Sequence, residues 1–428
     1  MQVIVIGGGV AGTAAARRLQ DKGAQVVVLE AAEAVGGRTR TLQRDGFAID
    51  TGAIFLMGSY DRTFDFLSDS GHRRDLTRWP ALAAVIDDDE RLNPVRYDRP
   101  WTFVRQPQLR LRDAARIATT AVRGVVGARV QPFDLDELAA ADDGTTLADW
   151  SRGAMGEPAY HALIRPLMEP LTGADPHRIS AAFTRALLQQ PHRTTLDVPL
   201  GGLGQVVNWL AEDIDVRLDT AALEITSEGN RVAVRTATET LEADGVVVAT
   251  DVLTARQLVG PVACPPVLEA LDAVEPIHAF HVWLGYRKDP WPGVAQDLVV
   301  EGTTGAHATY GVLLNNRRAP GSTPPGGQSV SVYLDRDQVG DRDRDGIIAL
   351  ARAAVDRAFG PATPDLAEVF EWPVTLIAPV PGHYRRMQTA RDGMPPRIRL
   401  AGDFLTHSGI EGALRSGEKA ADDLLAGG

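Results

Sequence analysis

Four residues near the N-terminus have the types and the spacing needed to hold a dinucleotide. Gly7, Gly9 and Gly12 form a GxGxxG motif, and Glu30 ends the next apolar run. Gly7 would make a tight turn, Gly9 would let backbone approach a pyrophosphate, and Gly12 would let a helix pack on a strand. Glu30 can accept hydrogen bonds from two ribose hydroxyls, and its charge disfavours the 2′-phosphate of NADP. The motif predicts a site for FAD or NAD.

The elements that must position these residues can be read from the flanking sequence. Residues 2–6 form a short β-branched run, an alanine-rich stretch reaches about Lys22, and a second apolar run covers residues 25–29. This order predicts a strand, a tight turn, a helix and a second strand, so that the N–H groups and dipole of the helix N-terminus point at the phosphates. The predicted contacts include the neighbouring residues Val10, Ala11 and Ala31.

Length, composition and charge limit the classes of protein that remain. A chain of 428 residues is too long for one ordinary core, so we expect two domains. The net charge of −12, from 44 basic and 56 acidic residues, disfavours nucleic-acid binding. Cys264 is the single cysteine, which excludes an internal disulfide and a cysteine-based metal site, and we expect it to be buried. The nine histidines show no clustered ligand spacing, so we predict no metal site.

The sequence also bears on location. It begins directly with the first predicted strand, without the basic and apolar segments of an export signal, and no apolar run approaches the ~18 residues needed to cross a bilayer. We therefore expect a soluble, cytoplasmic protein. Residues 113–129 read as an apolar helix with three interspersed arginines, for which a solvated surface is the favoured interpretation. Any membrane contact is expected to be peripheral at most.

A second motif follows Glu30 and makes the pattern more specific. Gly36-Gly37-Arg38 is followed by Asp50-x-Gly52-Ala53, and together with Glu30 this resembles the FAD-binding superfamily of amine oxidases, protoporphyrinogen oxidases and phytoene-type desaturases. The resemblance implies that Gly37 and Arg38 lie along the pyrophosphate and that backbone at Gly52 and Ala53 approaches the flavin ring. It also implies that backbone near Ala222 borders the adenine.

The C-terminal forty residues resemble the second flavin motif of the same superfamily. Ala401-Gly402-Asp403 follows a short apolar run, and Ile410-Glu411-Gly412-Ala413 opens a helix. The resemblance implies that Asp403 lies by the ribityl chain or the phosphates, and that Ile410, Gly412 and Ala413 face the pyrimidine edge of a non-covalent FAD. A helix N-terminus at that edge would stabilise the negative charge of reduced flavin.

The expected fold is α/β, with a discontinuous Rossmann-type FAD-binding domain and an α+β substrate domain that has an antiparallel sheet and helices. The FAD-binding domain is expected at residues 1–78, 196–260 and 386–428. The helical part of the substrate domain is expected at 79–195 and its sheet part at 261–385. In this last stretch the pattern predicts antiparallel strands at residues 278–286, 298–301, 309–314 and 329–334, and one helix, Asp345 to Phe359.

Candidate catalytic residues are harder to find. In amine oxidases of this superfamily a strand lysine holds water near flavin N5, and we place His281 at that site, where it could act as acid, base or substrate anchor or be a satisfied core residue. His407, just before the flavin-edge motif, is the second candidate. Amine oxidases usually carry an aromatic residue at the position of Gly409, so the missing lysine and ring favour the protoporphyrinogen oxidase and desaturase branch.

Several classes of function remain open. The leading expectation is an FAD-dependent oxidoreductase that removes a hydride and a proton from a C–C or C–N bond of a small, largely apolar molecule, and passes electrons to oxygen or another acceptor. Alternatives are a flavin-dependent amine oxidase, a flavin-dependent isomerase without net redox, and a binding protein like the GDP-dissociation inhibitors, which share the fold without using flavin.

Overall fold

The computed structural model describes residues 1–86, 91–106, 109–127, 129–190, 192–301 and 309–427. Its first layer is a five-stranded parallel sheet in the order β10-β2-β1-β14-β20. The central strands are apolar runs buried on both faces, as is typical of a parallel sheet between helices. The strands are β1 (Gln2–Ile6), β2 (Gln25–Leu29), β10 (Asp215–Arg217), β14 (Gly245–Val248) and β20 (Ile398–Leu400).

Two long helices pack side by side against this sheet. They are α1 (Val10–Asp21) and α16 (Ile410–Ala426), from opposite ends of the chain. Their close approach depends on a glycine, because a Cβ at Gly417 would overlap the carbonyl oxygen of Ala11. The expected strand, turn, helix and strand at the N-terminus are thereby confirmed, as is the C-terminal helix. The helices α9 (Gly204–Leu210), α10 (Val252–Val259), α11 (Pro265–Asp272) and α15 (His383–Asp392) complete this half of the molecule.

The second layer is a seven-stranded sheet in the order β19-β15-β18-β17-β16-β7-β8. Its pairings are antiparallel except for β16 with β7, which is parallel. One face packs on α14 (Arg344–Phe359), and α7 (Arg165–Thr172) lies against the sheet as well. The strands are β7 (Leu82–Ile86), β8 (Leu92–Arg96), β15 (Glu275–Tyr286), β16 (Leu298–Glu301), β17 (Thr309–Leu314), β18 (Gln328–Asp335) and β19 (Leu366–Ala378).

Three sequence-based expectations are wrong in this region. Residues 261–385 hold more than one helix, because α11, α14 and the short α12 (Asn315–Arg318) and α13 (Arg336–Val339) all fall within them. The long strand β19 is not among the expected strands. Cys264 is exposed rather than buried, since it is the N-cap of α11, where the chain turns at the surface before Pro265.

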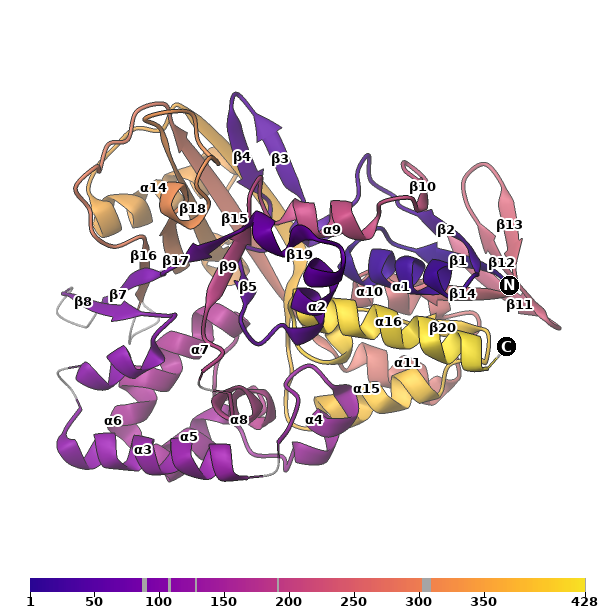
Figure 1. The fold of residues 1–428 in the computed structure, drawn as a ribbon, viewed down its shortest axis with the longest axis horizontal. Helices are drawn as coiled ribbons and strands as arrows, with labels where there is room; N and C mark the ends of the chain where they lie inside the picture. The colour runs from indigo at the N-terminus through magenta and orange to yellow at the C-terminus, as the bar shows by residue number, and fades with distance from the viewer. Residues whose placement is uncertain (87–90, 107–108, 128, 191, 302–308, 428) are drawn as a thin grey trace.

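A layer of helices covers the remaining side, at the lower left of Figure 1. Residues 157–172 form one helix with a π-helical turn at Tyr160–Ile164. Because Pro170 has no N–H for the carbonyl of Pro166, that oxygen is free to accept a 2.5 Å hydrogen bond from the Tyr97 hydroxyl. No helix of the described residues is long and apolar enough to span a bilayer. The helix of residues 157–172 begins with α6 (Glu157–Ala159), and the other helices here are α3 (Leu111–Val126), α4 (Leu135–Ala141), α5 (Leu147–Met155) and α8 (Ala182–Leu188).

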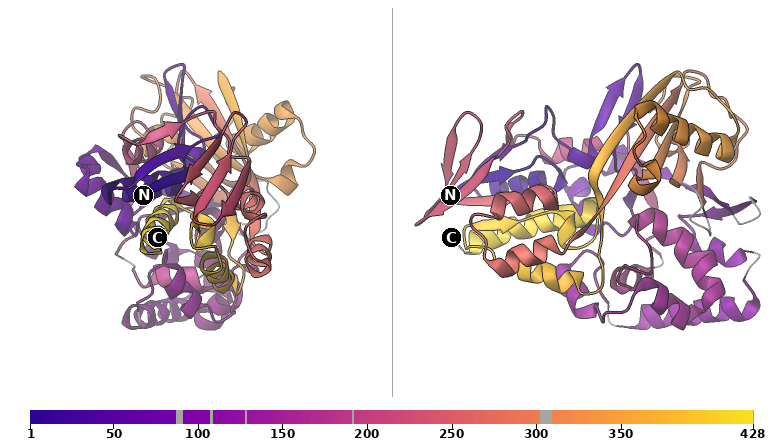
Figure 2. Two further views of the ribbon diagram at one scale, coloured as in Figure 1. Left: turned by 90° about the vertical axis from the view of Figure 1, so that its right-hand side faces the viewer. Right: turned by 180° about the vertical axis from the view of Figure 1, so that it is seen from behind.

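Three small sheets complete the fold. The antiparallel sheet β11-β12-β13 projects at the end of the molecule that also carries both termini, as Figure 2 shows from behind. Its first hairpin turns at Gly229, which has a φ of +57°, as the Gly-Asn pair predicts. The helix α2 (Asp61–Asp69) follows β5 in the chain. The strands of the three small sheets are β3 (Thr41–Arg44), β4 (Phe47–Asp50), β5 (Leu56–Met57), β6 (Leu76–Trp79), β9 (Leu196–Pro199), β11 (Glu224–Glu228), β12 (Arg231–Arg235) and β13 (Thr240–Ala243).

Candidate functional site

The three glycines of the first motif have three different surroundings. Gly7 has a φ of +104°, and a Cβ there would lie 2.7 Å from the carbonyl oxygen of Ala249. A Cβ at Gly12 would overlap the carbonyl oxygen of Gly7, so the turn and the helix need glycine at both positions. Gly9 differs, because a Cβ there would have no atom of another described residue within 4 Å, apart from its neighbours along the chain. The space beside Gly9 is open, as close approach of a ligand to the backbone requires.

Helix α1 begins at this open space with unpaired N–H groups. Its N-cap is Gly9, and no side chain caps it. Among the described residues the first backbone hydrogen bond of the helix is from the N–H of Thr13 to the carbonyl of Gly9, at 3.0 Å. The N–H groups of Val10, Ala11 and Gly12 are therefore available to an anion at the positive end of the helix dipole.

Glu30 is held rigidly beside the glycine turn. One carboxylate oxygen accepts the N–H of Gly8 at 2.6 Å, and the other accepts the N–H of Ala32 at 2.8 Å. Each oxygen keeps lone pairs for a further donor such as a ribose hydroxyl. The chain returns here from β10, since the N–H of Thr220 donates to the carbonyl of Glu30 at 2.8 Å, and the half-buried Ala222 follows two residues later. Ala31, next to Glu30, is exposed.

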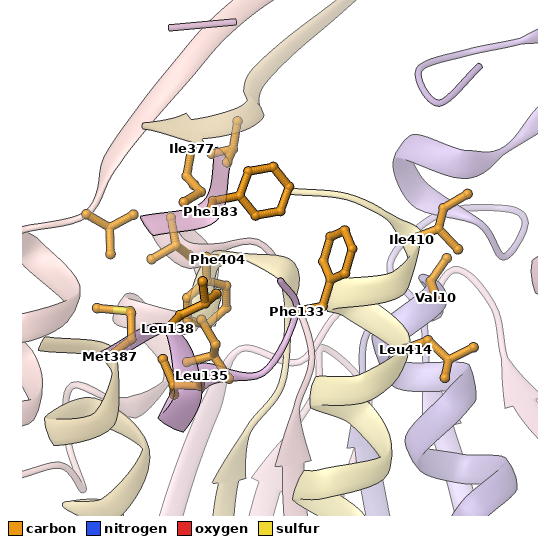
Figure 3. Close-up of a cluster of buried hydrophobic side chains, with 14 of the residues drawn as sticks. Val10, Phe133, Leu135, Leu138, Phe183, Ile377, Met387, Phe404, Ile410 and Leu414 are labelled. Atoms are coloured by element: carbon orange, nitrogen blue, oxygen red, sulfur yellow. The ribbon is translucent and has the colours of Figure 1, made fainter. Parts of the chain in front are cut away.

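The N-terminus of α16 is a second uncapped helix end. Its N-cap is Gly409, and its first backbone hydrogen bond is from the N–H of Ala413 to the carbonyl of Gly409, at 3.1 Å. Gly412 is required by packing, because a Cβ there would lie 2.6 Å from the carbonyl oxygen of His407. Figure 3 shows the buried side chains of Ile410 and Val10 next to each other, one from each helix.

The N-termini of α1 and α16 point in the same direction but lie at different positions along it. The backbone of Ala11 meets α16 at Gly417, two helical turns after Ile410, so the N-terminus of α16 extends about 10 Å beyond that of α1. Two sets of free N–H groups are thus separated along one line. This spacing suits an extended ligand with an anionic part at α1 and a second electron-rich part at α16.

Arg38 and Asp403, which come from the two motifs, form one ion pair. The Arg38 guanidinium donates to both carboxylate oxygens of Asp403 at 2.7 and 3.0 Å, and to the carbonyl of Thr375 at 2.9 Å. Gly37 before it has a φ of +50° and open space at its Cβ position. Next to this turn, the N–H of Ala53 donates to the carbonyl of Arg38 at 2.9 Å, and a Cβ at Gly52 would overlap the same oxygen. Both motifs and residues 52–53 therefore meet at one place.

Sequence reasoning misses the role of Glu411. This fully buried carboxylate accepts the backbone N–H groups of Arg62 and Thr63, both at 2.9 Å, and the Thr63 hydroxyl at 2.7 Å. Arg415 on the next turn completes the set at 2.7 Å. Glu411 thus caps α2, which has no cap of its own, and fixes that helix to the start of α16. Its position in the first turn of α16 gives no hint of this distant partner.

His281 lies in the seven-stranded sheet, against the segment that carries Gly52. It is 1% exposed, and its Nδ1 is 3.1 Å from the carbonyl oxygen of Thr51. Burial lowers its pKa to about 4, so the ring is neutral at neutral pH. Since a carbonyl can only accept, Nδ1 carries the hydrogen, and Nε2 is an acceptor without a partner among the described residues.

His407 lies immediately before α16 in an aromatic environment. Its ring stacks on Phe183 with centroids 3.5 Å apart, and Phe183 contacts Phe133 edge-to-face at 5.5 Å. Figure 3 shows Phe133 lying between Phe183 and Ile410. Burial lowers the pKa of His407 to about 4. Nδ1 donates to the carbonyl of Ser408 at 3.1 Å, and Nε2 has no partner in the part of the chain that the structure describes.

The amine-oxidase pattern lacks an aromatic residue at Gly409 and a lysine at His281. Gly409 has a φ of +150°, and a Cβ there would lie 2.9 Å from the Tyr60 hydroxyl, so a larger residue does not fit. Tyr60 is buried and contacts Phe133 edge-to-face. The lysines of the chain lie elsewhere: Lys22 caps the C-terminal end of α1, Lys288 is exposed after β15, and Lys419 is exposed on α16.

These residues fit a flavin dinucleotide by their own geometry. The rigid carboxylate of Glu30, the uncapped end of α1 beside the open space at Gly9, and the uncapped end of α16 lie in the order in which FAD carries its adenosine ribose, its diphosphate and its isoalloxazine ring. The described residues contain no group of three or more His, Cys, Asp or Glu placed to hold a metal ion.

Comparisons with solved structures agree with this fold. A protein named "putative protoporphyrinogen oxidase" from Exiguobacterium sp. 255-15 superposes with a TM-score of 0.79 at 18% identity, over 98% of each chain. Cyclohexylamine oxidase from Brevibacterium oxydans IH-35A gives a TM-score of 0.76 at 20% identity, over 99% of this chain and 98% of that one. At these identities the likeness shows the α/β fold alone, and it confirms the expected fold class.

Sequence relatives are matched over shorter stretches. The zeta-carotene-forming phytoene desaturase of Myxococcus xanthus is 34% identical over 131 residues, which are 26% of this chain and 25% of that protein. The curated relatives, which also include flavin-containing amine oxidases, are covered over 8% to 56% of their own length. The family model described as "Flavin containing amine oxidoreductase" matches residues 10–425. The chain belongs to the flavin-containing amine oxidoreductase family, and its cofactor is FAD.

Proposed function

We propose that this protein is an FAD-dependent oxidoreductase that takes a hydride and a proton from a C–C or C–N bond of a small, largely apolar molecule, and passes the electrons to oxygen or another acceptor. The observation that carries the proposal is the convergence of both helix ends and the Arg38–Asp403 pair at one edge of the parallel sheet. We place the FAD-binding domain at residues 1–78, 196–260 and 386–428, which supply all five strands of that sheet.

Each part of the chain has a task in holding the cofactor. In this proposal the N–H groups of Val10, Ala11 and Gly12 bind the diphosphate and Glu30 binds the adenosine ribose. Ala222 and Ala31 border the adenosine. Backbone at Gly37 and Arg38 lies along the diphosphate, Asp403 lies by the ribityl chain, and the N–H groups of Ile410, Gly412 and Ala413 face the pyrimidine edge.

Bound flavin supplies the redox chemistry, and the protein supplies position, dryness and charge. The dipole of α16 stabilises negative charge that develops at the pyrimidine edge. His407, whose Nε2 has no partner among the described residues, lies near that edge and is the proposed proton acceptor or substrate anchor. Its low pKa keeps the ring neutral and able to accept a hydrogen bond. Tyr60, Phe133 and Phe183 exclude water from this place.

An apolar substrate fits better than an amine. His407 stacks on Phe183, which packs edge-to-face on Phe133, and Figure 3 shows both phenylalanines in one cluster with the buried Ile377. Neither the strand lysine nor a second ring at Gly409 is present to hold and orient an amine. We therefore favour the protoporphyrinogen oxidase and desaturase branch over the amine oxidases.

An absorbance spectrum of the purified protein tests the proposal first. We expect flavin bands that move to the supernatant after heat denaturation, because the site predicts non-covalent FAD. We expect Glu30→Ala to retain less FAD, while Glu33→Ala, a nearby surface change, retains as much as wild type. A protein without flavin, even after incubation with FAD, would refute the enzyme and revive a binding protein.

Substrate class is tested by anaerobic bleaching of the bound flavin. A porphyrinogen and an apolar polyene should reduce the flavin, and primary amines should not. Bleaching by amines would favour an amine oxidase. Catalysis that requires reduced flavin and leaves the oxidation level of the product unchanged would favour an isomerase.

The surface proposed for peripheral membrane contact is that of α3. Only Asp113 of this helix is buried, while Leu111, Val122 and Val126 are 92%, 62% and 79% exposed, and its arginines are exposed as well. Exposed apolar and basic side chains together suit an anionic lipid surface. Co-sedimentation with anionic vesicles, lost in Val122→Ser/Val126→Ser, would support peripheral contact, and absence of wild-type protein from the pellet would refute it.

A further inference from the structure

The segment Thr51–Ile54 joins the proposed FAD site to the seven-stranded sheet. On one side its N–H groups donate to carbonyl groups of the turn that contains Arg38. The N–H of Thr51 donates to the carbonyl of Arg40, and that of Ala53 donates to the carbonyl of Arg38, both at 2.9 Å. The position of this segment is thus tied to the residue that pairs with Asp403.

On the other side its carbonyls accept hydrogen bonds from three neighbouring strands. The carbonyl of Thr51 accepts from His281 Nδ1 at 3.1 Å and from Trp372 Nε1 at 2.9 Å. The carbonyl of Gly52 accepts from the Tyr333 hydroxyl at 3.2 Å. These donors come from β15, β19 and β18, and we call His281, Tyr333 and Trp372 the carbonyl clamp. Three donors aimed at two successive carbonyls fix the segment against the sheet.

A buried ion pair holds the ends of the same segment. The Arg318 guanidinium is 2.7 Å from the carboxylate of Asp50, and both side chains are buried. Arg318 also donates to the carbonyl of Ile54 at 2.7 Å. Residues 50–54 therefore depend on the substrate side of the molecule for most of their carbonyl partners. A shift of the sheet would be transmitted to the backbone at Gly52 and Ala53.

The surroundings of His281 suit a holding role. Its ring lies between Tyr333 and Phe370, with centroids 4.7 and 5.5 Å away. The register places these three residues opposite one another on adjacent strands. Stacking on two rings fixes the imidazole plane, so its N–H stays directed at Thr51. The bond uses the neutral ring and does not change with pH near neutrality.

We propose that the carbonyl clamp positions the flavin: His281, Tyr333 and Trp372 set the place of the Gly52–Ala53 backbone and so the fit of the isoalloxazine ring. They are positioning residues, since they act through that backbone. The inference rests on the proposed FAD site and adds the residues by which the substrate sheet controls it. It also gives His281 a task other than proton transfer.

Two tryptophans provide a matched test. Trp372→Phe removes one donor to Thr51. Trp283→Phe is the control, because Trp283 lies in the same sheet as the half-buried Trp372, is itself buried, packs edge-to-face on Phe47 at 5.1 Å, and its Nε1 has no partner among the described residues. His281→Leu removes the second donor to Thr51. His281→Asn keeps an amide N–H near the position of Nδ1.

The readouts are the dissociation constant of FAD, the visible circular dichroism of bound FAD, and hydrogen exchange at residues 51–54 in the apoprotein. Trp372→Phe and His281→Leu should each weaken FAD binding about fivefold, which corresponds to one net hydrogen bond. The double variant should lose more than the product of the two, because Thr51 then has no donor. Trp283→Phe should stay within about twofold of wild type, and His281→Asn should restore binding and the dichroism.

Each outcome bears on one proposal. Equal FAD affinity and dichroism in Trp372→Phe and Trp283→Phe would overturn the clamp. His281→Asn that binds FAD normally but no longer allows flavin reduction by substrate would overturn the assignment of His281 to positioning alone, in favour of proton transfer by Nε2. If wild-type protein binds no FAD, the proposed function fails. The hydrogen bonds of the clamp are then tested in the apoprotein alone. Faster hydrogen exchange at residues 51–54 in Trp372→Phe than in Trp283→Phe would support them, and equal exchange would refute them.

Discussion

Asp297 is a buried acid whose ionisation should lower the stability of this protein near neutral pH. It precedes β16 and is fully buried. One carboxylate oxygen accepts the indole N–H of Trp79 at 3.0 Å, and the other has no partner among the described residues. Burial raises the pKa of Asp297 from 3.8 to about 6, because its charge loses hydration that these contacts do not replace.

The sign and size of the effect follow from linkage. Between pH 4 and 6 the folded protein holds a proton on Asp297 that the unfolded chain has released, so stability falls as the pH rises through this window. A shift of about two pKa units corresponds to a loss of about 3 kcal/mol in the free energy of unfolding. This loss is complete above about pH 7. Asp297→Asn keeps an acceptor for Trp79 and removes the charge. It should therefore stabilise the protein by about 3 kcal/mol at about pH 8, and by little at about pH 4.

Urea unfolding of wild type and variant at several pH values from about 4 to about 8 measures this difference. The control is Asp197→Asn, since the buried Asp197 is 3.0 Å from the Nε of Arg78, whereas Asp297 has no cationic partner at such a distance within the described part of the chain. That variant should gain no stability at the alkaline end. A difference between wild type and Asp297→Asn that is the same at every pH, or a loss of stability at the alkaline end, would refute the reasoning.

Other substitutions separate binding from folding. Gly9→Ala meets no atom of another described residue, apart from its neighbours along the chain, and should leave the melting temperature of the apoprotein unchanged while weakening FAD binding at least about tenfold; a tight FAD complex would contradict the phosphate site. The Cβ added in Gly12→Ala would overlap the carbonyl oxygen of Gly7, so this variant should have a lower melting temperature as the apoprotein, and an unchanged value would contradict the packing argument. Glu411→Ala leaves two N–H groups of α2 without their acceptor and should cost about 2 kcal/mol or more in urea unfolding. The comparison is Glu418→Ala, which removes a half-buried partner of the Arg62 side chain and no backbone acceptor, so equal losses in the two variants would contradict the capping role.

The local motifs can be predicted because their geometry is encoded within a few residues. The glycine turn with α1, the strand that comes directly before Glu30 and the uncapped start of α16 all follow from neighbouring residue types. The same holds for the hairpin at Gly229, where a Gly-Asn pair determines the turn. In each case the residues that decide the conformation are adjacent in sequence.

Contacts between distant segments cannot be predicted in this way. The ion pair of Arg38 with Asp403, the cap that Glu411 provides for α2 and the hydrogen bonds to Thr51 each join residues hundreds of positions apart. Nothing in the sequence near Tyr333 signals that its hydroxyl reaches Gly52. Such pairings depend on how the sheets pack against each other, which residue type and periodicity do not encode.

Strand β19 escapes sequence reasoning for a local reason. It contains Pro373, which has no N–H to donate and usually argues against a strand. The sheet order explains why the proline is tolerated, because β19 is an edge strand. The pairing with β15 is also irregular close to Pro373, where the register shifts between Ile277 and Ala279. An edge position cannot be recognised before the topology is known.

The order of the parallel sheet has a consequence for how the chain folds during synthesis. Strand β1 is made first, yet one of its two neighbours is β14, and β14 in turn pairs with β20 near the end of the chain. Closing such long loops makes the fold one of high contact order, which slows folding. The alanine-rich face of α1 also stays uncovered until α16 packs against it. Until the ribosome releases the segment that carries β20 and α16, the nascent chain exposes a sheet edge and an uncovered helix, so chaperone demand should peak late in translation.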